Sequence, residues 1–442
     1  MTSRSDCCCC TFFQWMPSIA FLLLVPIPAC LAISSGTLNG IMPWFSQQII
    51  PFFLCLLYMW HLLYRHHFIN FLGFRWTFLL LCTLLCLLIV GLITMLGNYG
   101  LDIELRKDIR GESVPLFQLK VLGRSCIYFI VGLALILNGI RRLKWPLLAF
   151  WLILTLAIFY KTDFKIMSLL SDSATLFYLG DNYALISILA ISLSSKRLLA
   201  IILPVSILGL TTIQSRGSLL GFLAVAPFMV VISSFSQWVK VSALIAAALI
   251  LTHYCVNEKA FTSSKVLKML NVEKTGNNGH NLLMDKSFSE RKEVFMEQLN
   301  RIDVWWFRGE YAGQVRQYRE LGCYMHNWLS FWQQYGLIPF LLFVGLYLGQ
   351  YAVVLCGYFS DAKCNFIMEI RKTKARFRFG HKKRRTKYYD RLRVDNRVLL
   401  ATFLLATFNL IEAVFARSYA TPYIWLSMGM MPAYLLMRAK RR

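Results

Sequence analysis

The sequence predicts an all-α protein that crosses a membrane many times, with about twelve transmembrane helices. Hydrophobic residues make up 57% of the 442 positions, and the mean hydropathy is +0.54. Apolar runs recur along the whole chain, and many are long enough to cross the roughly 30 Å hydrocarbon layer, which takes about 20 helical residues. No soluble domain of independent size remains between them. These observations exclude a soluble protein.

The apolar runs also divide the chain into three predicted parts. The first run follows Arg4 without a small-residue cleavage site, so we expect a retained helix and not a signal peptide. The runs lie near 17–35, 45–64, 76–96, 121–140, 145–160, 174–194, 198–214, 217–236, 241–255, 337–356, 398–416 and 421–437. We therefore expect helices 1–9 in residues 1–255, a large helical loop in 256–336, and helices 10–12 in 337–442 with a basic loop at 357–397.

The net charge of +25 is distributed in a way that indicates membrane topology and not nucleic-acid binding. We place the basic C-terminal end in the cytoplasm and assign the preceding spans alternating directions. Every short basic cluster then lies on the cytoplasmic side. This is the positive-inside pattern, which places both termini in the cytoplasm. The clusters are Arg65, Arg141–Lys144, Lys196–Arg197, Lys240 and the block 371–397. We interpret that block as a topology signal drawn to anionic lipids, with an acidic partner as the alternative.

The same orientation exports four segments, of which the longest is 256–336. The others are 97–120, 161–173 and 415–421. The long segment has nearly balanced charge and several aromatic residues, so we expect it to fold and not to act as a linker. We see no internal repeat in the sequence.

Thirteen cysteines raise two questions about covalent and metal chemistry. A metal or thiol role for the run Cys7–Cys10 lacks a second ligand cluster, so we predict no metal site. Cys255 and Cys323 flank the exported segment 256–336. They would form a disulfide in an oxidising compartment, or stay as two thiols at the lipid boundary.

His326 is the most informative ionisable residue of the chain. It precedes Asn327 in YMHNWLSFWQQYGLIPF, directly before an apolar run. Histidine changes charge near neutral pH, and an ionisable group at a membrane boundary is a functional candidate. The residues after Asn327 predict a short amphipathic helix in the membrane interface, and Gly336 with Pro339 predicts a break after it. A hydrogen-bonded interfacial histidine is the structural alternative.

Arginines and one carboxylate occupy the same predicted exported boundary. Arg216 is the lone charge in TTIQSRGSLLGF, where it would bind a ligand or only extend to the surface. Arg417 lies close to Glu412 in the last exported turn, and the two would form a buried ion pair or serve substrate. Asp181 lies in an apolar helix, and the cost of burying it predicts a partner such as one of these arginines.

Two further arginines belong to the long exported segment. Arg291 lies in SFSERKEVFMEQLNRIDVWWFRGEY, where the spacing of apolar residues predicts an amphipathic helix. Arg308 lies near the end of the same stretch and is a further candidate for substrate binding. Charged residues of this kind more often lie on a solvated surface than in a site.

Together these residue types suit the transfer of a glycan from a lipid diphosphate. Arginine binds phosphate through a planar fork of donors and keeps its charge at any relevant pH. A histidine within reach of a sugar hydroxyl would remove its proton during attack. Arginine would replace a metal ion in stabilising the leaving diphosphate. We therefore predict a metal-independent transferase without a cofactor.

Three short motifs carry a resemblance to a known superfamily. They are the S-R-G sequence at Ser215, Arg216 and Gly217, the loop arginine Arg291 followed by Gly309, and the pair His326 and Asn327 followed by Gly336. In this order they resemble the O-antigen polymerase and O-antigen ligase superfamily of bacteria, which are polytopic GT-C type glycosyltransferases. The resemblance covers roughly residues 175–356. The interval from Asn327 to Gly336 is one residue shorter than in the ligase pattern, and Pro339 takes the place of a small residue or tyrosine.

The resemblance implies an activity and a role for each candidate residue. The donor would be a glycan on undecaprenyl pyrophosphate at the periplasmic face of the bacterial inner membrane. A polymerase would pass it to a lipid-linked repeat unit, and a ligase to lipid A-core. Membrane lipids surround the protein, and a chain-length regulator is a further expected partner. The implied catalytic residues are His326, Arg216 and Arg291, and the implied substrate-binding residues are Asn327, Arg417, Asp181 and Arg308.

A transporter or flippase for a lipid-linked substrate is the alternative of another class. Twelve spans with cytoplasmic termini fit it equally well. Transporters, however, are usually built from repeated halves with broken helices in matching positions. The long exported segment lies between spans nine and ten and not at a midpoint, which favours the transferase.

Overall fold

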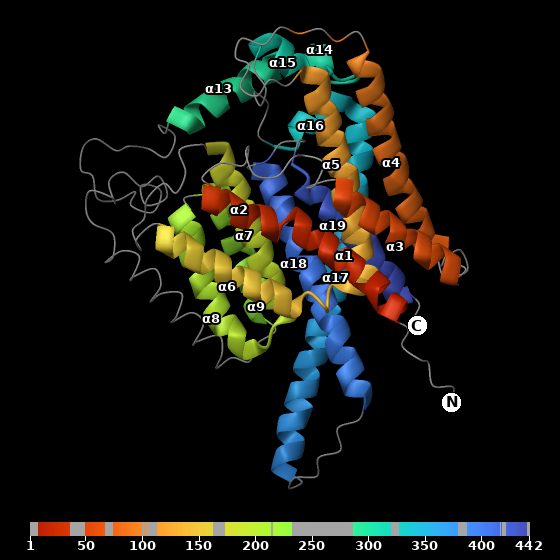
Figure 1. Ribbon diagram of the computed structural model, residues 1–442, viewed down its shortest axis with the longest axis vertical. Coiled ribbons are helices and arrows are strands. Elements are labelled where there is room, and N and C mark those ends of the chain that lie inside the picture. The colour runs from red at the N-terminus through yellow and green to blue at the C-terminus, as the bar shows by residue number, and fades with distance from the viewer. Residues whose placement is uncertain are drawn as a thin grey trace, which may run out of the picture.

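The protein is an all-α bundle with a helical cap at one end (Figure 1). The computed structural model describes residues 8–35, 49–66, 74–99, 101, 103, 113–161, 173–213, 215–231, 286–319, 327–378, 387–415, 417 and 421–439. Within these ranges every regular element is a helix, as predicted. Six helical segments are long and apolar enough to cross a membrane, namely Phe13–Ile33, Phe78–Asn98, Val114–Leu137, Lys144–Lys161, Leu337–Ser360 and Arg397–Phe415.

Every predicted apolar run coincides with a helix except 241–255, which lies outside the described residues. The first part contains α1 (Cys8–Leu24), α2 (Pro26–Ser35), α3 (Ile50–His66), α4 (Phe74–Asn98), α5 (Val114–Ala134), a π-helical turn (Leu135–Gly139), α6 (Lys144–Lys161), α7 (Ser173–Leu193), α8 (Lys196–Ile213) and α9 (Arg216–Val231). The remainder contains α13 (Lys286–Asn300), α14 (Ile302–Trp305), α15 (Gly313–Tyr318), α16 (Leu329–Tyr335), α17 (Leu337–Arg378), α18 (Lys387–Phe415) and α19 (Tyr423–Ala439). The count of twelve spans stays a prediction.

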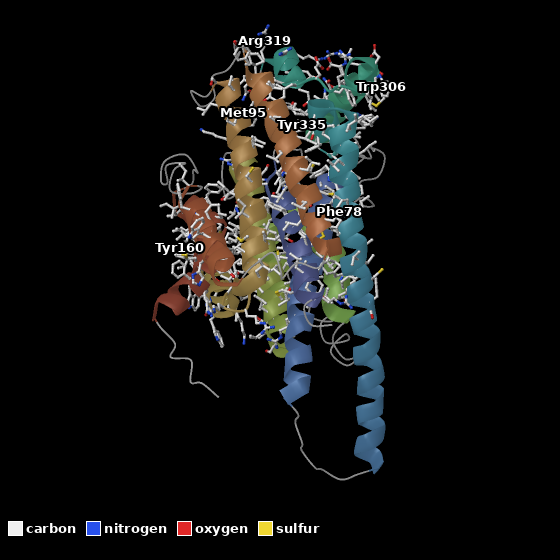
Figure 2. All side chains as sticks on the ribbon, turned by 90° about the vertical axis from the view of Figure 1, so that its right-hand side faces the viewer. Phe78, Met95, Tyr160, Trp306, Arg319 and Tyr335 are labelled. Carbon is white, nitrogen blue, oxygen red and sulfur yellow. The ribbon has the colours of Figure 1, made fainter. Side chains whose placement is uncertain are left out.

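The outer face of α4 illustrates why the fold requires an apolar environment. Phe78 and Met95 are 59% and 58% exposed and point away from the bundle (Figure 2). Leu81, Leu85, Leu88 and Leu92 repeat between them at helical spacing and are also exposed. Such a continuous apolar surface is not tolerated on a soluble monomer, so this face is expected to contact lipid.

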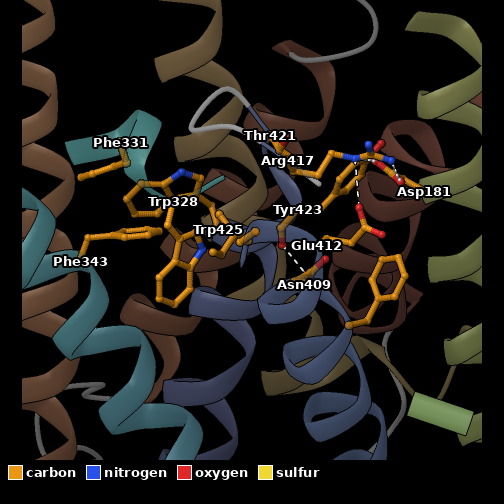
Figure 3. A pocket seen from close by; sticks show the side chains of 13 residues that line it. Asp181, Trp328, Phe331, Phe343, Asn409, Glu412, Arg417, Thr421, Tyr423 and Trp425 are labelled. Atoms are coloured by element: carbon orange, nitrogen blue, oxygen red, sulfur yellow. Dashed lines mark hydrogen bonds and ion pairs between the residues drawn. The ribbon is translucent and has the colours of Figure 1, made fainter. Parts of the chain in front are cut away.

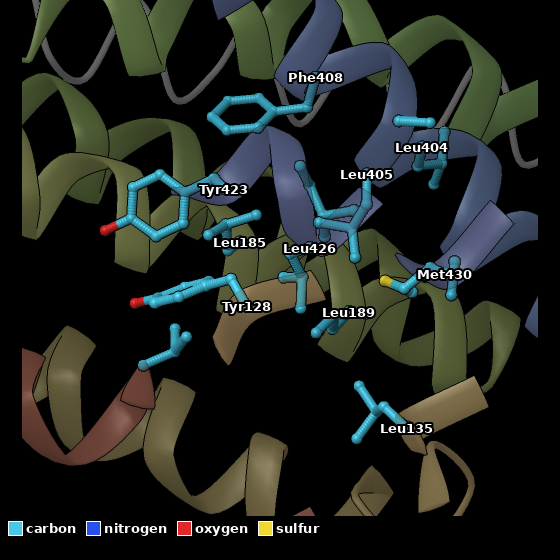
Figure 4. Packing of buried hydrophobic residues seen from close by; sticks show 14 of the residues in the cluster. Tyr128, Leu135, Leu185, Leu189, Leu404, Leu405, Phe408, Tyr423, Leu426 and Met430 are labelled. Carbon is cyan, nitrogen blue, oxygen red and sulfur yellow. The ribbon is translucent and has the colours of Figure 1, made fainter. Parts of the chain in front are cut away.

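The core is centred on the close packing of α5 against α19. A Cβ on Gly132 of α5 would collide with the carbonyl oxygen of Leu426, and one on Gly429 of α19 would collide with that of Phe129. Glycines therefore let the two backbones approach directly, as is common between membrane helices. Tyr128 packs edge-on against Tyr423 beside this contact (Figure 4). These two helices form the centre around which the other helices pack.

The basic segment 357–397, which we predicted as a loop, is largely helical. The helix α17 continues without interruption to Arg378, and α18 begins at Lys387 (Figure 1). The 42 residues of α17 correspond to about 63 Å at 1.5 Å per residue, about twice the hydrocarbon thickness. Lysine, arginine, glutamate and methionine are good helix formers, and no glycine or proline occurs between 358 and 378, so the helix does not end at the end of its apolar part.

Several predicted cytoplasmic residues meet at the end of the bundle from which this hairpin emerges. Arg397 donates to the carbonyl oxygen of Leu193, the last residue of α7, at 3.0 Å. The guanidinium of Arg438, near the end of α19, lies beside Gly357 of α17. A cation at a helix C-terminus is stabilised by the helix dipole. These cations therefore gather at the same end of the bundle, and the cytoplasmic location of that end stays a prediction.

The contact between α5 and α19 predicts opposite results for two glycine-to-alanine substitutions. Gly429→Ala should lower the melting temperature of the purified protein by several degrees, because overpacking typically costs about 1–3 kcal/mol. Gly345→Ala is the matched control, since nothing lies within 4 Å of a Cβ built on that helical glycine. It should leave stability unchanged or slightly higher. Equal losses in both variants would contradict the close packing.

Candidate functional site

The described part of the segment 256–336 forms a cap in which α16 is buried. Gln333 and Gln334 of α16 are only 2% and 6% exposed. Gln333 donates to Gln298 of α13 and accepts from Gln314 of α15. Gln334 accepts the backbone N–H of Ala312 at 3.1 Å. Other amides of the cap therefore satisfy these glutamines. The interfacial position of α16 stays a prediction.

Two glycines from the motifs described above touch each other in the cap. Gly309 has φ +76° and Gly336 has φ +87°, and a Cβ on Gly309 would lie 2.5 Å from the backbone nitrogen of Gly336. The N–H of Leu337 donates to Phe307 O at 3.0 Å, which joins the two turns. Only glycine combines this backbone conformation with such a close approach. The predicted break at Gly336 is confirmed, since α16 ends at Tyr335 and α17 begins at Leu337.

A buried ion cluster lies below the cap, centred on Arg417. Its guanidinium donates to both carboxylate oxygens of Asp181, with Nε at 2.8 Å and Nη2 at 2.5 Å. Its Nε also lies 3.2 Å from Oε2 of Glu412 (Figure 3). The expected arginine partner of Asp181 and the expected Glu412–Arg417 pair are thus both confirmed. Burial lowers the pKa of Arg417, but the two carboxylates outweigh it and raise the pKa above its ordinary value.

The S-R-G motif opens a helix directly beside this cluster. Ser215 precedes α9 and accepts the N–H of Leu219 at 2.9 Å, as a helix-capping residue does. Ser218, one turn into the helix, donates to Asp181 Oδ1 at 2.5 Å and accepts from Arg417 at 3.3 Å. The backbone of Arg216 is therefore fixed next to the ion cluster. Its side chain lies outside the part of the chain that the structure describes.

A small pocket lies between the ion cluster and a wall of aromatic side chains (Figure 3). Asp181, Glu412 and Arg417 line it on one side. Trp328, Phe331, Phe343 and Trp425 line the other side and pack against one another. The pocket therefore has one charged wall and one apolar wall.

The histidine–asparagine motif leads into the aromatic wall. Asn327 Oδ1 accepts the N–H of Leu329 at 3.0 Å and so fixes the start of α16. The next residue after Asn327 is Trp328, which lines the pocket. His326 lies outside the described residues. Ser218 follows the S-R-G motif and Trp328 follows the His-Asn pair, more than one hundred residues apart in sequence. Ser218 contacts two residues of the charged wall, and Trp328 lines the aromatic wall.

Three side chains in the pocket wall carry buried polar atoms without a hydrogen bond. They are both carboxylate oxygens of Glu412, Nε1 of Trp328 and the hydroxyl of Tyr423. Buried polar groups are normally hydrogen-bonded, so such groups need an explanation. Trp328 and Tyr423 were not predicted as pocket residues, because a tryptophan or tyrosine in an apolar stretch looks like ordinary core. The only sequence signal was the position of Trp328 directly after the His-Asn pair.

The remaining candidates lie in the cap and not in the pocket wall. Arg308 is exposed in the turn before Gly309. Arg291 lies on α13, seven residues before Gln298 and thus on the same face of that helix, and its side chain lies outside the described part. Cys255 and Cys323 also lie outside the described residues, so the disulfide stays a prediction. No group of three or more metal-ligating side chains occurs within the described ranges.

Comparisons with protein-family models, with curated proteins and with solved structures found no match.

Because the ion cluster is buried, neutralising Asp181 should destabilise the protein more than neutralising an exposed carboxylate. Asp181→Asn should lower the melting temperature by several degrees, because breaking a buried ion pair costs on the order of 3 kcal/mol. Asp303→Asn is the control, since the side chain of Asp303 is exposed on α14. It should cost less than about 1 kcal/mol. Thermal unfolding of both variants in the same detergent measures this, and a smaller loss for Asp181→Asn would contradict it.

Proposed function

We propose that this chain is a membrane glycosyltransferase of bacterial surface-polysaccharide assembly. In this proposal it transfers a glycan from undecaprenyl pyrophosphate to a lipid-linked repeat unit, the reaction of an O-antigen polymerase. One observation supports it most: Ser218, in the helix that the S-R-G motif starts, contacts Asp181 and Arg417, and these two residues line the same pocket as Trp328, which follows His326 and Asn327. The resemblance of the motifs supplies the chemistry that such a pocket would serve.

The proposed reaction is a single displacement at the anomeric carbon of the donor sugar. An acceptor hydroxyl attacks that carbon and forms the new glycosidic C–O bond, while His326 takes its proton. The bond between the anomeric carbon and the diphosphate oxygen breaks, and its electron pair stays on the diphosphate. One base and no enzyme nucleophile imply inversion at the anomeric carbon. No oxidant, reductant or metal is needed for this balance.

The diphosphate is assigned to Arg216 and Arg291 and not to Arg417. The guanidinium of Arg417 already contacts Asp181 and Glu412, so it would have to leave two carboxylates to hold an anion. Arg417 and Asp181 therefore act by holding the pocket wall in place. Asn327 positions the start of α16, and exposed Arg308 has no contact with the pocket wall.

The experiment is complementation of a strain that lacks the chromosomal copy of the gene. His326→Ala, Arg216→Ala and Arg291→Ala should each abolish long-chain polysaccharide, because loss of a general base alone typically costs about 10²–10⁴-fold in rate. Lys292→Ala is the matched control, since Lys292 is exposed on the same helix as Arg291. Electrophoresis of lipopolysaccharide and an immunoblot of the membrane fraction are the two readouts.

Different gel patterns separate the two reactions of the superfamily. In the strain without the gene, core carrying a single repeat unit indicates a polymerase. Bare core with lipid-linked polymer accumulating indicates a ligase. Normal chain lengths in His326→Ala and Arg216→Ala would contradict the transferase altogether.

A further inference from the structure

The cap presents an apolar edge that lies apart from the pocket. Trp306 and Phe307, which follow α14, are 49% and 50% exposed, and Val304 is exposed about one turn earlier. Their neighbour Trp305 is fully buried, and its Nε1–H donates to Gln298 O at 3.0 Å. The same short segment therefore anchors one tryptophan inside the cap and presents the next one outward. We call Val304, Trp306 and Phe307 the apolar edge.

Contacts with α16 and α17 fix the height of the apolar edge along the bundle. The N–H of Leu337, the first residue of α17, donates to Phe307 O at 3.0 Å. Trp332 of α16 donates from Nε1 to Trp306 O, and its ring stacks on that of Phe340 with centroids 5.4 Å apart. Figure 2 shows Trp306 at the outer side of the cap, beside the start of α17. The apolar edge is thus level with the first turn of that helix.

The first turn of α17 also begins an outward apolar face. Ile338, Leu341 and Leu348 are exposed and follow one another at helical spacing. They belong to the candidate membrane span Leu337–Ser360, whose 24 residues correspond to about 36 Å at 1.5 Å per residue. The hydrocarbon layer is about 30 Å thick, so the ends of this span lie at its boundary. Tryptophan is enriched at that depth.

Charged residues on both sides of the apolar edge agree with this depth. Asp303 and Arg308 are exposed directly before and after its three residues. Charges are costly in the hydrocarbon layer but are tolerated among lipid head groups. Arginine also binds phosphate through a planar fork of donors, and every phospholipid carries a phosphate at this level. The continuity with α17 and the adjacent cation therefore favour the bilayer surface as the occupant of this edge.

We propose that the apolar edge docks the cap onto the head-group region of the bilayer, with Arg308 binding the phosphate of a phospholipid. Trp306 and Phe307 enter the interface, and Trp305 holds them to the rest of the cap. The proposal does not depend on the transferase reaction, because its surface lies outside the pocket. Docking would hold the cap at a constant height above the lipid-facing helices.

Photochemical crosslinking of the full-length chain in lipid nanodiscs tests the docking. Phe307 is replaced by p-benzoylphenylalanine in nanodiscs of equal parts phosphatidylglycerol and phosphatidylethanolamine, and lipid adducts are counted by intact-mass spectrometry. The control carries the same label at Arg319, an exposed cap residue at the top of Figure 2. Lipid adducts should be at least several-fold more abundant at position 307. The label at Trp306 gives a second test position, and melting temperatures check the fold.

The lipid class in these adducts tests the role of Arg308. One basic residue near the surface should enrich anionic phosphatidylglycerol about fivefold over phosphatidylethanolamine among adducts at position 307. Arg308→Gln should bring this ratio towards one. Arg316→Gln is the matched control, since Arg316 is an exposed arginine on α15, outside the apolar edge. It should leave the ratio unchanged.

Other outcomes would overturn the proposal. Lipid adducts no more frequent at positions 306 and 307 than at 319 would show that the edge does not meet the bilayer. Adducts with the mass of a second chain as the main product would assign the edge to contact between copies of the protein. An unchanged lipid ratio in Arg308→Gln would remove Arg308 from phosphate binding.

Discussion

The ion pair between Asp181 and Arg417 is the interaction on which the arrangement of the site depends. A carboxylate in the middle of an apolar helix cannot stay buried without a cation, and its arginine comes from the far end of the chain. Ser218 joins the same pair and brings in the start of α9. Three segments that are distant in sequence are thereby fixed at one point, and the pocket opens beside it.

The two carboxyl groups that surround Arg417 limit its ability to bind a phosphate. In isolation, an arginine at a membrane boundary suggests phosphate binding, and Arg417 was a candidate for it on that ground. In the folded protein Asp181 and Glu412 surround its guanidinium, so an anion would have to displace both carboxyl groups to reach it.

Hydropathy was sufficient to predict an all-helical membrane protein, and burial cost was sufficient to predict a partner for Asp181. The break at Gly336 also followed from local rules, because glycine and proline act on the backbone of their own turn. The burial of Gln333 and Gln334 did not follow. An amphipathic pattern shows that a polar face exists, but it does not reveal whether that face meets water or other amides. The aromatic wall escaped prediction for a related reason, since Trp425 looks the same in a core and in a pocket.

The contact between Gly309 and Gly336 links the cap to the pocket through the length of α16. Gly336 is held by the turn that contains Gly309, and Trp328, eight residues earlier, lies in the pocket wall. Each residue of an α-helix turns the chain by about 100°, so one residue more in this interval would rotate Trp328 away from the wall. The interval is one residue shorter than in the ligase pattern. Its length therefore sets which side chain at the start of this helix reaches the pocket.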